Sequence, residues 1–272
     1  MPRVHDGARE LGAAEMIHVK KAFTLRKSEL GKKFRVENNN LDISALLEGS
    51  DLTAHRLGDL AEAHREERNR KNANAKFRYI QISDIDVHLG RIKSYRVFTG
   101  DAAPNNARRK MKFGDVLVST RRPTRGAVVA VPKDFDGQIC TVFFTTLRVK
   151  DWEVLDPRYL SLFLRTSLGR FQFQSLITET AYPVISDDDV ENMTVLTPDI
   201  EEQRRLSTAY SDAVTKFFAN MNQAYKHVTA AKQEIETFVL GEDAEKLNTP
   251  VFGLSALEQA ENSEDEIENE SA

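Results

Sequence analysis

The feature that most constrains this fold is an apolar pattern in the C-terminal third of the chain, between residues 206 and 238. Apolar residues recur there at intervals of 4-3-4-4-3-4-3-4-3, with the extra four-residue step between Phe217 and Met221. Such spacing places the side chains along one face of an α-helix, and its persistence is typical of a coiled coil with one stutter. We call these residues the pairing face: Leu206, Tyr210, Ala213, Phe217, Met221, Ala224, Val228, Ala231, Ile235 and Phe238.

The ends of this helix are marked as well. Thr197-Pro198 is followed by the acids Asp199, Glu201 and Glu202, which favour a helix N-terminus, and Gly241 is placed to end the helix. At ~1.5 Å per residue a helix over residues 198–240 reaches roughly 60 Å, more than one small domain needs for its own core. We therefore expect the pairing face to contact a second helix. The alternative is a long helix that folds back on its own domain.

A second pattern lies between Lys112 and Pro132, in the stretch KFGDVLVSTRRPTRGAVVAVP. Two runs rich in β-branched residues, 115–120 and 126–131, predict strands. The loop between them carries Arg121, Arg122 and Arg125, and Pro123 restricts its backbone. Guanidinium groups on a stiff loop suit phosphates or the acceptor edge of guanine. A solvated loop that binds nothing is the other interpretation.

Charge is distributed unevenly, although the formal net charge of the 272 residues is only −4. Residues 55–131 contain 17 Lys and Arg against 8 Asp and Glu, a net +9, whereas residues 241–272 contain 1 Lys against 10 acids, a net −9. This asymmetry predicts a body that binds a polyanion, followed by an acidic tail that we expect to be disordered. The overall pI near 5.9 therefore does not exclude DNA as the ligand.

Further basic and amide side chains precede the arginine loop. We interpret Arg108, Arg109, Lys110 and Lys112 as candidate phosphate contacts, since they cluster within five residues. The weaker candidates for DNA contacts are Asn105, Asn106 and Tyr182.

The other segments indicate an α+β class. Residues 77–82 and 137–149 have strand character, and residues 41–60 predict short helical pieces broken near Gly49-Ser50 and Gly58. Asp156-Pro157 begins a helix whose apolar residues continue to Phe171. We expect one globular domain with a mixed or antiparallel β core, followed by one long C-terminal coiled-coil helix.

Several classes of function find no support in the sequence. No stretch approaches the ~18 consecutive apolar residues of a membrane helix, and no secretory signal is visible, so a cytoplasmic protein is expected. The chain contains none of the common phosphate-loop, zinc or nucleophile-elbow motifs, and its histidines lack ligand spacing. The lone Cys140 lies in an apolar run, and the acidic cluster 187–189 is best explained by helix capping. We predict no catalytic residue, metal site or bound cofactor in this chain.

The order of these pieces resembles the specificity subunit of type I restriction-modification systems. The resemblance rests on FRYIQISDID, then KFGDVLVSTRRPTRG, then LDPRYLSLFLRTSLG, and finally VENMTVLTPDIEEQRRL leading into a long helix. It covers residues 57–240, and Pro198 with Glu202-Gln203 at the helix entrance is its most specific part.

This resemblance implies a target-recognition domain at 30–197 and a spacer and dimerisation helix at 198–240, between an N-terminal segment 1–29 and the tail 241–272. In that family the recognition domain binds one half of a two-part site in double-stranded DNA, and the helix docks a methyltransferase subunit. A restriction and translocase subunit can join the complex. The partners would use S-adenosylmethionine and, for restriction, ATP and Mg²⁺.

The usual subunit of that family contains two recognition domains and two helices, whereas this chain shows one of each and no internal repeat. The chain resembles a half-subunit that would form a homodimer or pair with another half-subunit. A symmetric dimer would recognise an interrupted palindrome. Two alternatives come from other classes: a coiled-coil scaffold or protein-interaction module without DNA specificity, and an enzyme whose site has no known motif.

Overall fold

The computed structural model describes residue 47 and residues 50–69, 73–177 and 183–240. The helices are α2 (Leu57–Leu60), α3 (Pro157–Arg165), α4 (Ser167–Leu176), α5 (Asp187–Glu191) and α6 (Ile200–Leu240). The strands are β1 (Thr53–Arg56), β2 (Ala61–Ala63), β3 (Lys76–Ile80), β4 (Ile85–Asp86), β5 (Arg91–Ile92), β6 (Arg96–Thr99), β7 (Ala107–Lys110), β8 (Val116–Ser119), β9 (Val128–Ala130), β10 (Ile139–Thr141), β11 (Phe144–Val149) and β12 (Thr194–Thr197).

Two four-stranded sheets form the body, with strand orders β2-β11-β8-β9 and β6-β3-β10-β7. The pairing is antiparallel except between β10 and β3, which are parallel. Strand β8 is buried on both faces: Val116 and Val118 pack towards α3 and α4, and Leu117 packs into a second cluster with Ile80 and Phe144. The predicted α+β class with a mixed β core is confirmed.

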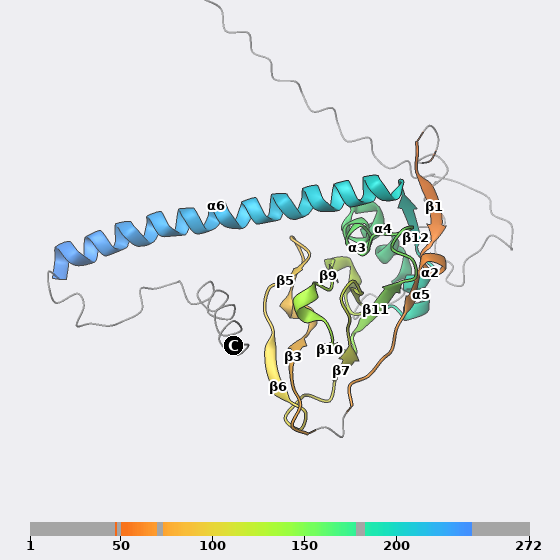
Figure 1. Ribbon diagram of the computed structural model, residues 1–272, viewed down its shortest axis with the longest axis horizontal. Coiled ribbons are helices and arrows are strands. Elements are labelled where there is room, and N and C mark those ends of the chain that lie inside the picture. Colours follow the sequence, from red (N-terminus) through yellow and green to blue (C-terminus); the bar gives the residue numbers. More distant parts are fainter. Residues whose placement is uncertain (1–46, 48–49, 70–72, 178–182, 241–272) are drawn as a thin grey trace, which may run out of the picture.

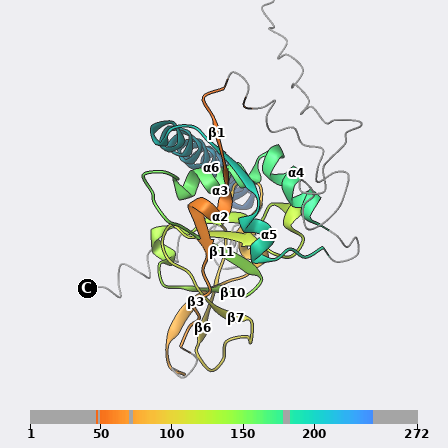
Figure 2. The same ribbon diagram turned by 90° about the vertical axis from the view of Figure 1, so that its right-hand side faces the viewer.

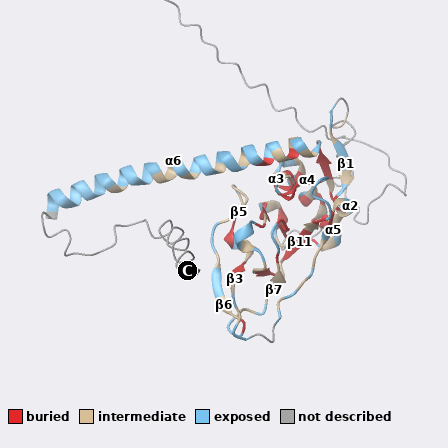
Figure 3. Ribbon diagram, in the orientation of Figure 1, coloured by how far each residue is buried: buried red, intermediate tan, exposed pale blue. Residues whose placement is uncertain are grey.

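Helix α6 leaves the body and extends far beyond it (Figure 1). Viewed along this helix, α3 and the sheets lie on one side of its first turns (Figure 2). Only those first turns contribute buried residues, and most of the remainder is exposed (Figure 3). Val214 and Phe218 are half-buried. The predicted long C-terminal helix is confirmed. It begins at Ile200, two residues later than expected, because the Asp199 carboxylate accepts a hydrogen bond from Glu202 N at 2.8 Å and caps it.

The side chain of Gln203 fixes this helix to the body. It is 1% exposed; its Oε1 accepts from the backbone N–H of Asp156 at 3.0 Å. Its Nε2 donates to the carbonyl oxygens of Val154 at 3.1 Å and Pro198 at 2.9 Å. Asp156 in turn caps α3, accepting from Arg158 N at 2.7 Å, as its sequence position predicted. One buried amide therefore joins the start of α6 to the start of α3.

Two expectations about the helices are wrong. Residues 53–56 form strand β1, which pairs with β12, where helical pieces were expected, and Gly58 lies inside α2 and does not break it. The helix from residue 157 also ends at Arg165, and α4 begins after Thr166, whose Oγ1 accepts from Gly169 N at 3.3 Å. A Cβ at Gly169 would lie 2.5 Å from Leu164 O, so this tight junction requires glycine.

The predicted strand at 137–149 is divided in two. Residues 139–141 form β10 in one sheet, and residues 144–149 form β11 in the other. A single apolar run therefore crosses between the sheets, a change of direction that periodicity does not reveal. Segments 1–29 and 241–272, and Gly241 as the helix end, lie outside the described residues, and the domain limits stay predictions.

We predict that Gln203→Ala lowers the free energy of unfolding by about 2–3 kcal/mol, because it leaves a buried N–H and two carbonyl oxygens without their partner. Urea denaturation of the purified chain measures this difference. Gln223→Ala, on the exposed part of the same helix, is the matched control and should change stability by less than about 0.5 kcal/mol. Equal effects of the two substitutions would contradict the anchoring role.

Candidate nucleic-acid interface

The loop at residues 121–125, here called the arginine loop, is held by backbone hydrogen bonds on both sides. On one side, Thr120 N donates to Phe143 O at 2.9 Å. On the other side, Arg122 N donates to Pro183 O at 2.9 Å and Ile185 N donates to Thr120 O at 3.0 Å. The loop is therefore a fixed platform between β8 and β9, as its sequence predicted, although segment 183–185 was not foreseen as its support.

Arg122 has a backbone conformation that is unusual for a residue with a side chain. Its φ of 50° lies in the left-handed region, and it is the one non-glycine residue with positive φ in the described part of the chain. The hydrogen bonds from Arg122 N to Pro183 and from Arg125 N to Arg122 O hold this conformation. Strained backbone of this kind is maintained only when its surroundings fix it, and Arg122 itself is exposed.

The three arginines line one cavity of about 1100 Å³, here called the arginine cleft. Asn106 lines it too, so four of the predicted DNA-binding residues meet at one site. The cleft has further polar lining residues that were not among the predicted DNA contacts: Gln81, Ser83, Asp86, His88, Lys93 and Thr141. Apart from Thr141, they follow β3 in the chain, and β3 pairs with β10. A prediction of that strand pairing could have found them.

Aromatic rings hold several arginine side chains in the same domain. The guanidinium of Arg121 lies 3.5 Å from the centroid of the Phe143 ring. Arg78 lies over both Tyr95 and Phe135, at 4.9 Å and 5.5 Å. Stacking limits the rotamers of a long side chain while leaving its N–H groups available at the edge of the plane. The cationic groups are thus partly ordered before any ligand binds.

The second basic cluster occupies a different place. Lys110 and Lys112 lie 3.1 Å and 3.5 Å from the two carboxylate oxygens of Glu66, and Arg108 lies 3.8 Å from Glu67. The hydrogen bond from Lys110 holds the pKa of Glu66 below its usual value. These residues do not line the arginine cleft. Three of the four predicted phosphate contacts are therefore engaged in ion pairs, which their positions in the sequence did not indicate.

The other candidates are placed as follows. Arg109 pairs with Cys140 between β7 and β10, and its Nε is buried without a hydrogen-bond partner. Asn105 is exposed on the turn before β7, outside the arginine cleft, and Tyr182 lies outside the described residues.

The pairing face is largely open to solvent. Phe217, Val228, Ile235 and Phe238 are 50%, 53%, 62% and 89% exposed. Tyr210 differs, because its hydroxyl accepts from Arg165 Nη2 at 2.8 Å and donates to Leu89 O at 3.2 Å, which turns the ring towards the body. In the structure, Tyr210 thus joins the helix to its own domain.

Two further features concern the described residues only. They include no group of three or more His, Cys, Asp or Glu that could hold a metal ion. None of the helices they form is long and apolar enough to cross a membrane.

Comparison with known proteins gives a consistent result. The family model described as "Type I restriction modification DNA specificity domain" matches residues 50–230. The HindI specificity subunit of Haemophilus influenzae is 26% identical over 187 residues, covering 67% of this chain and 40% of that protein. The solved HsdS subunit from Thermoanaerobacter tengcongensis has a TM-score of 0.56 at 31% identity, covering 71% of this chain and 50% of that one.

A second solved chain comes from a study of complex assembly and conformational transition of the type I restriction-modification system. It has a TM-score of 0.55 at 30% identity, covering 70% of this chain and 49% of that one. The chain thus spans about half the length, or less, of the relatives it matches.

We predict that Arg122→Gly is more stable than Arg122→Ala by about 1 kcal/mol, since both remove the side chain but only alanine retains the strain of a positive φ. Chemical denaturation of the two variants measures the difference. At Arg121, where φ is not positive, the order should reverse, with alanine the more stable. The same order at both positions would contradict the assignment of strain to Arg122.

Proposed function

This chain belongs to the type I restriction-modification DNA specificity family, and on that basis we propose that it recognises one half of a two-part DNA target and directs a methyltransferase partner to it. The observation that carries the proposal is the arginine cleft, which gathers Arg121, Arg122 and Arg125 on a fixed loop. The chain itself would perform no catalysis and bind no cofactor. Its partners would supply S-adenosylmethionine and, for restriction, ATP and Mg²⁺.

The chemistry of the cleft fits base recognition better than general phosphate binding. A guanidinium can donate two parallel hydrogen bonds to O6 and N7 of guanine, and an amide such as Asn106 can pair with adenine. Selective contacts require side chains with few alternative positions. The stacking of Arg121 on Phe143 and the fixed backbone of Arg122 both limit those positions.

The ion pairs of the second cluster fit a different role. Glu66 faces both Lys110 and Lys112, so the charge of these lysines is partly balanced in the absence of DNA. Exposed ion pairs are weak, and a phosphate can replace a carboxylate partner at small cost. In this proposal Lys110, Lys112 and Arg108 contact the backbone of the duplex and set its register, while the arginine cleft contacts the bases.

We further propose that two copies of the chain pair through α6 in antiparallel orientation. The register is centred between Asn220 and Met221, and in the three layers on each side of the centre it places large residues opposite small ones. In this register Phe217 lies opposite Ala224, and Ala213 opposite Val228. Tyr210, whose ring is turned to the body, lies opposite Ala231, which requires little space. Alternating large and small side chains allow close approach of two helices.

The ends of the pair are compatible with the same register. Leu206 lies opposite Ile235, and Arg205 opposite Glu236 of the second copy, so an apolar layer and opposite charges meet at each end. An antiparallel pair separates the two recognition domains by the length of the helix. A two-fold symmetric dimer of this form would bind an interrupted palindrome, because protein symmetry is mirrored in the DNA.

We predict that the chain, combined with the methyltransferase subunit of its own system, selects a two-part sequence from a pool of random duplexes. Arg121→Ala should relax the preference at individual base pairs by ~1–3 kcal/mol, since each bidentate contact discriminates to that extent. Sequencing of the selected duplexes measures the preference at each position. Binding should also weaken with salt, with a log-log slope near −0.9 per phosphate contacted.

Two matched variants sharpen this experiment. Lys226→Ala removes one positive charge from the exposed distal half of α6, and should leave the selected sequence unchanged. Glu66→Gln removes the carboxylate between Lys110 and Lys112, and should raise affinity for all sequences alike. A chain that selects no sequence and shows no salt-dependent binding would contradict DNA recognition.

For the helix pair, we predict that Met221→Cys forms a disulfide with its own copy under mild oxidation. The residue lies beside the two-fold axis of the proposed register. Val228→Cys alone should not crosslink, since its two copies are separated by roughly 22 Å along the helix axis. A mixture of Ala213→Cys and Val228→Cys chains should crosslink. Non-reducing electrophoresis measures each product.

The native cysteine does not disturb this measurement. Cys140 is fully buried, and burial raises the pKa of its thiol to about 12. A parallel dimer would give the opposite result, with an efficient crosslink between two Val228→Cys chains. Phe217→Asp places a charge on the pairing face and should yield a monomer in sedimentation; an unchanged mass would contradict pairing through α6.

A further inference from the structure

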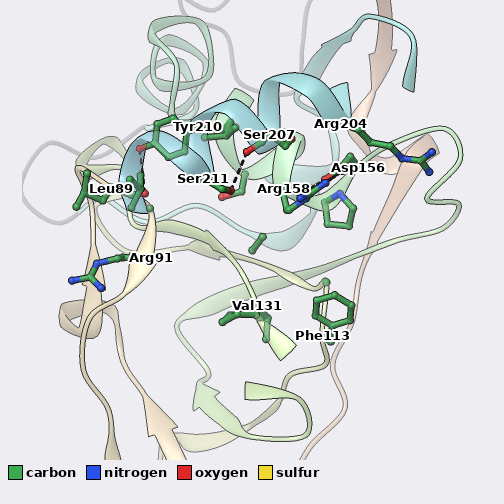
Figure 4. A pocket seen from close by; sticks show the side chains of 18 of the residues that line it. Leu89, Arg91, Phe113, Val131, Asp156, Arg158, Arg204, Ser207, Tyr210 and Ser211 are labelled. Carbon is green, nitrogen blue, oxygen red and sulfur yellow. Dashed lines mark hydrogen bonds and ion pairs between the residues drawn. The ribbon is translucent and has the colours of Figure 1, made fainter. Parts of the chain in front are cut away.

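A second cavity, of about 710 Å³, lies between the first turns of α6 and the body, and we call it the helix cleft. Figure 4 shows Tyr210, Ser207 and Ser211 on the helix side, facing Phe113 and Val131 across the space. None of the three arginines of the arginine loop lines it. It is therefore a site separate from the proposed DNA surface.

The floor of the helix cleft carries two exposed aromatic rings. Phe113 is 48% exposed and Trp152 is 41% exposed, and the two rings meet edge to face with centroids 5.4 Å apart. Gly114, with φ of 81°, allows the indole to lie directly on its backbone. A fixed pair of aromatic rings, open to solvent beside apolar Val131 and Pro132, is typical of a surface that binds another apolar group.

The rim of the helix cleft is cationic. The charged residues that line it are Arg91, Lys133, Arg158, Arg165 and Arg204, with Asp156 as the one acid among the lining residues. Asp156 is already paired with Arg158 at 2.8 Å, and Arg204 lies 2.8 Å from the exposed carboxylate of Glu153. Arg165 Nε is buried without a hydrogen-bond partner, although its Nη2 donates to Tyr210. An occupant with carboxylates beside apolar side chains would match both the rim and the floor.

The chain itself contains such a segment directly after α6. Residues 241–257 read GEDAEKLNTPVFGLSAL: three acids come first, at 242, 243 and 245, and apolar residues follow at 251, 252, 254 and 257. We propose that this segment of a second copy occupies the helix cleft, with its carboxylates on the arginine rim and Phe252 against Trp152. This inference rests on the antiparallel helix pair proposed above.

The distance that the segment after α6 can span favours the segment of a second copy as the occupant of the helix cleft. From Leu240 back to Ser207 the helix rises roughly 50 Å. Twelve residues from Leu240 to Phe252 span at most about 43 Å when fully extended. In the antiparallel register, by contrast, Leu240 of the second copy lies opposite Glu201, about one turn from Arg204 on the rim. Helix pairing thus brings Phe252 of the second copy near Trp152, whose carbonyl accepts from Arg204, whereas Phe252 of the same chain cannot reach it.

Occupancy of the helix cleft would tie each body to the helix of the other copy at both ends of the dimer. The angle between body and helix sets the separation of the two recognition domains. A segment that bridges α6, the loop at Phe113 and the loop at Trp152 would fix this angle. The proposed role of residues 241–257 is therefore positional, and it does not require contact with DNA.

Trp152, the single tryptophan of the chain, reports directly on this site. We predict that acrylamide quenches its fluorescence two- to three-fold less in the full chain than in a chain ending at Leu240. Phe252→Ser with Leu254→Ser should give the quenching of the shortened chain. Equal quenching in the full and shortened chains would overturn the proposal.

The monomeric variant separates this inference from the proposed function. If Phe217→Asp yields a monomer whose Trp152 is quenched as in the shortened chain, the segment binds across the dimer. If Trp152 stays protected in that monomer, the two-copy arrangement is overturned. If the unmodified chain proves monomeric, the helix pairing fails on its own. A synthetic peptide of residues 241–257, added to the shortened chain, then tests binding to the helix cleft. Protection of Trp152 that Arg204→Ala weakens would support binding of the segment there. No protection would refute it.

Discussion

A buried side-chain amide anchors the start of α6 to the body. Gln203 accepts from Asp156 N and donates to the carbonyl oxygens of Val154 and Pro198, so it satisfies three backbone groups that lie at a domain edge. A helix that projects roughly 60 Å from its anchor acts as a lever, because a small rotation at its base displaces its far end strongly. Directional hydrogen bonds restrict that rotation better than apolar contacts do, since their energy falls steeply with misalignment. The separation of two recognition domains in the proposed dimer follows from this junction.

The arginine loop shows the same principle on a smaller scale. Its backbone is held from two sides, by Phe143 and by segment 183–185, and the ring of Phe143 also supports the guanidinium of Arg121. Side chains that are ordered before binding lose less entropy when they form selective contacts. The strain at Arg122 is the local consequence, because the surrounding hydrogen bonds impose a left-handed conformation on a residue other than glycine.

Features that depend on residues close together in the chain could be predicted from the sequence. Features that depend on contacts between distant segments could not. Helix α6 and the cap at Asp156 follow from periodicity and from residue preferences at helix starts. Strand β1 does not, because its partner β12 lies about 140 residues away and its own residues have no strong alternation. The arginine loop was identified as a unit, whereas Gln81 and His88 in the same cleft were not, since only the pairing of β3 with β10 brings their segment there. Likewise, the sequence around Lys110 and Lys112 does not indicate that Glu66, more than 40 residues earlier, balances part of their charge.

The two clefts differ in a way that assigns them different partners. The arginine cleft gathers three arginines and an amide among apolar and other polar residues, which suits a rigid polyanion with hydrogen-bonding groups along its edge. The helix cleft places two exposed aromatic rings inside a cationic rim, and a nucleic-acid backbone would leave those rings without an apolar partner. An acidic segment that carries its own phenylalanine satisfies both parts. Because α6 forms one wall of the helix cleft and also carries the pairing face, the two proposals are linked: in the proposed dimer, pairing and occupancy of the cleft would stabilise each other and fix the recognition domains relative to each other.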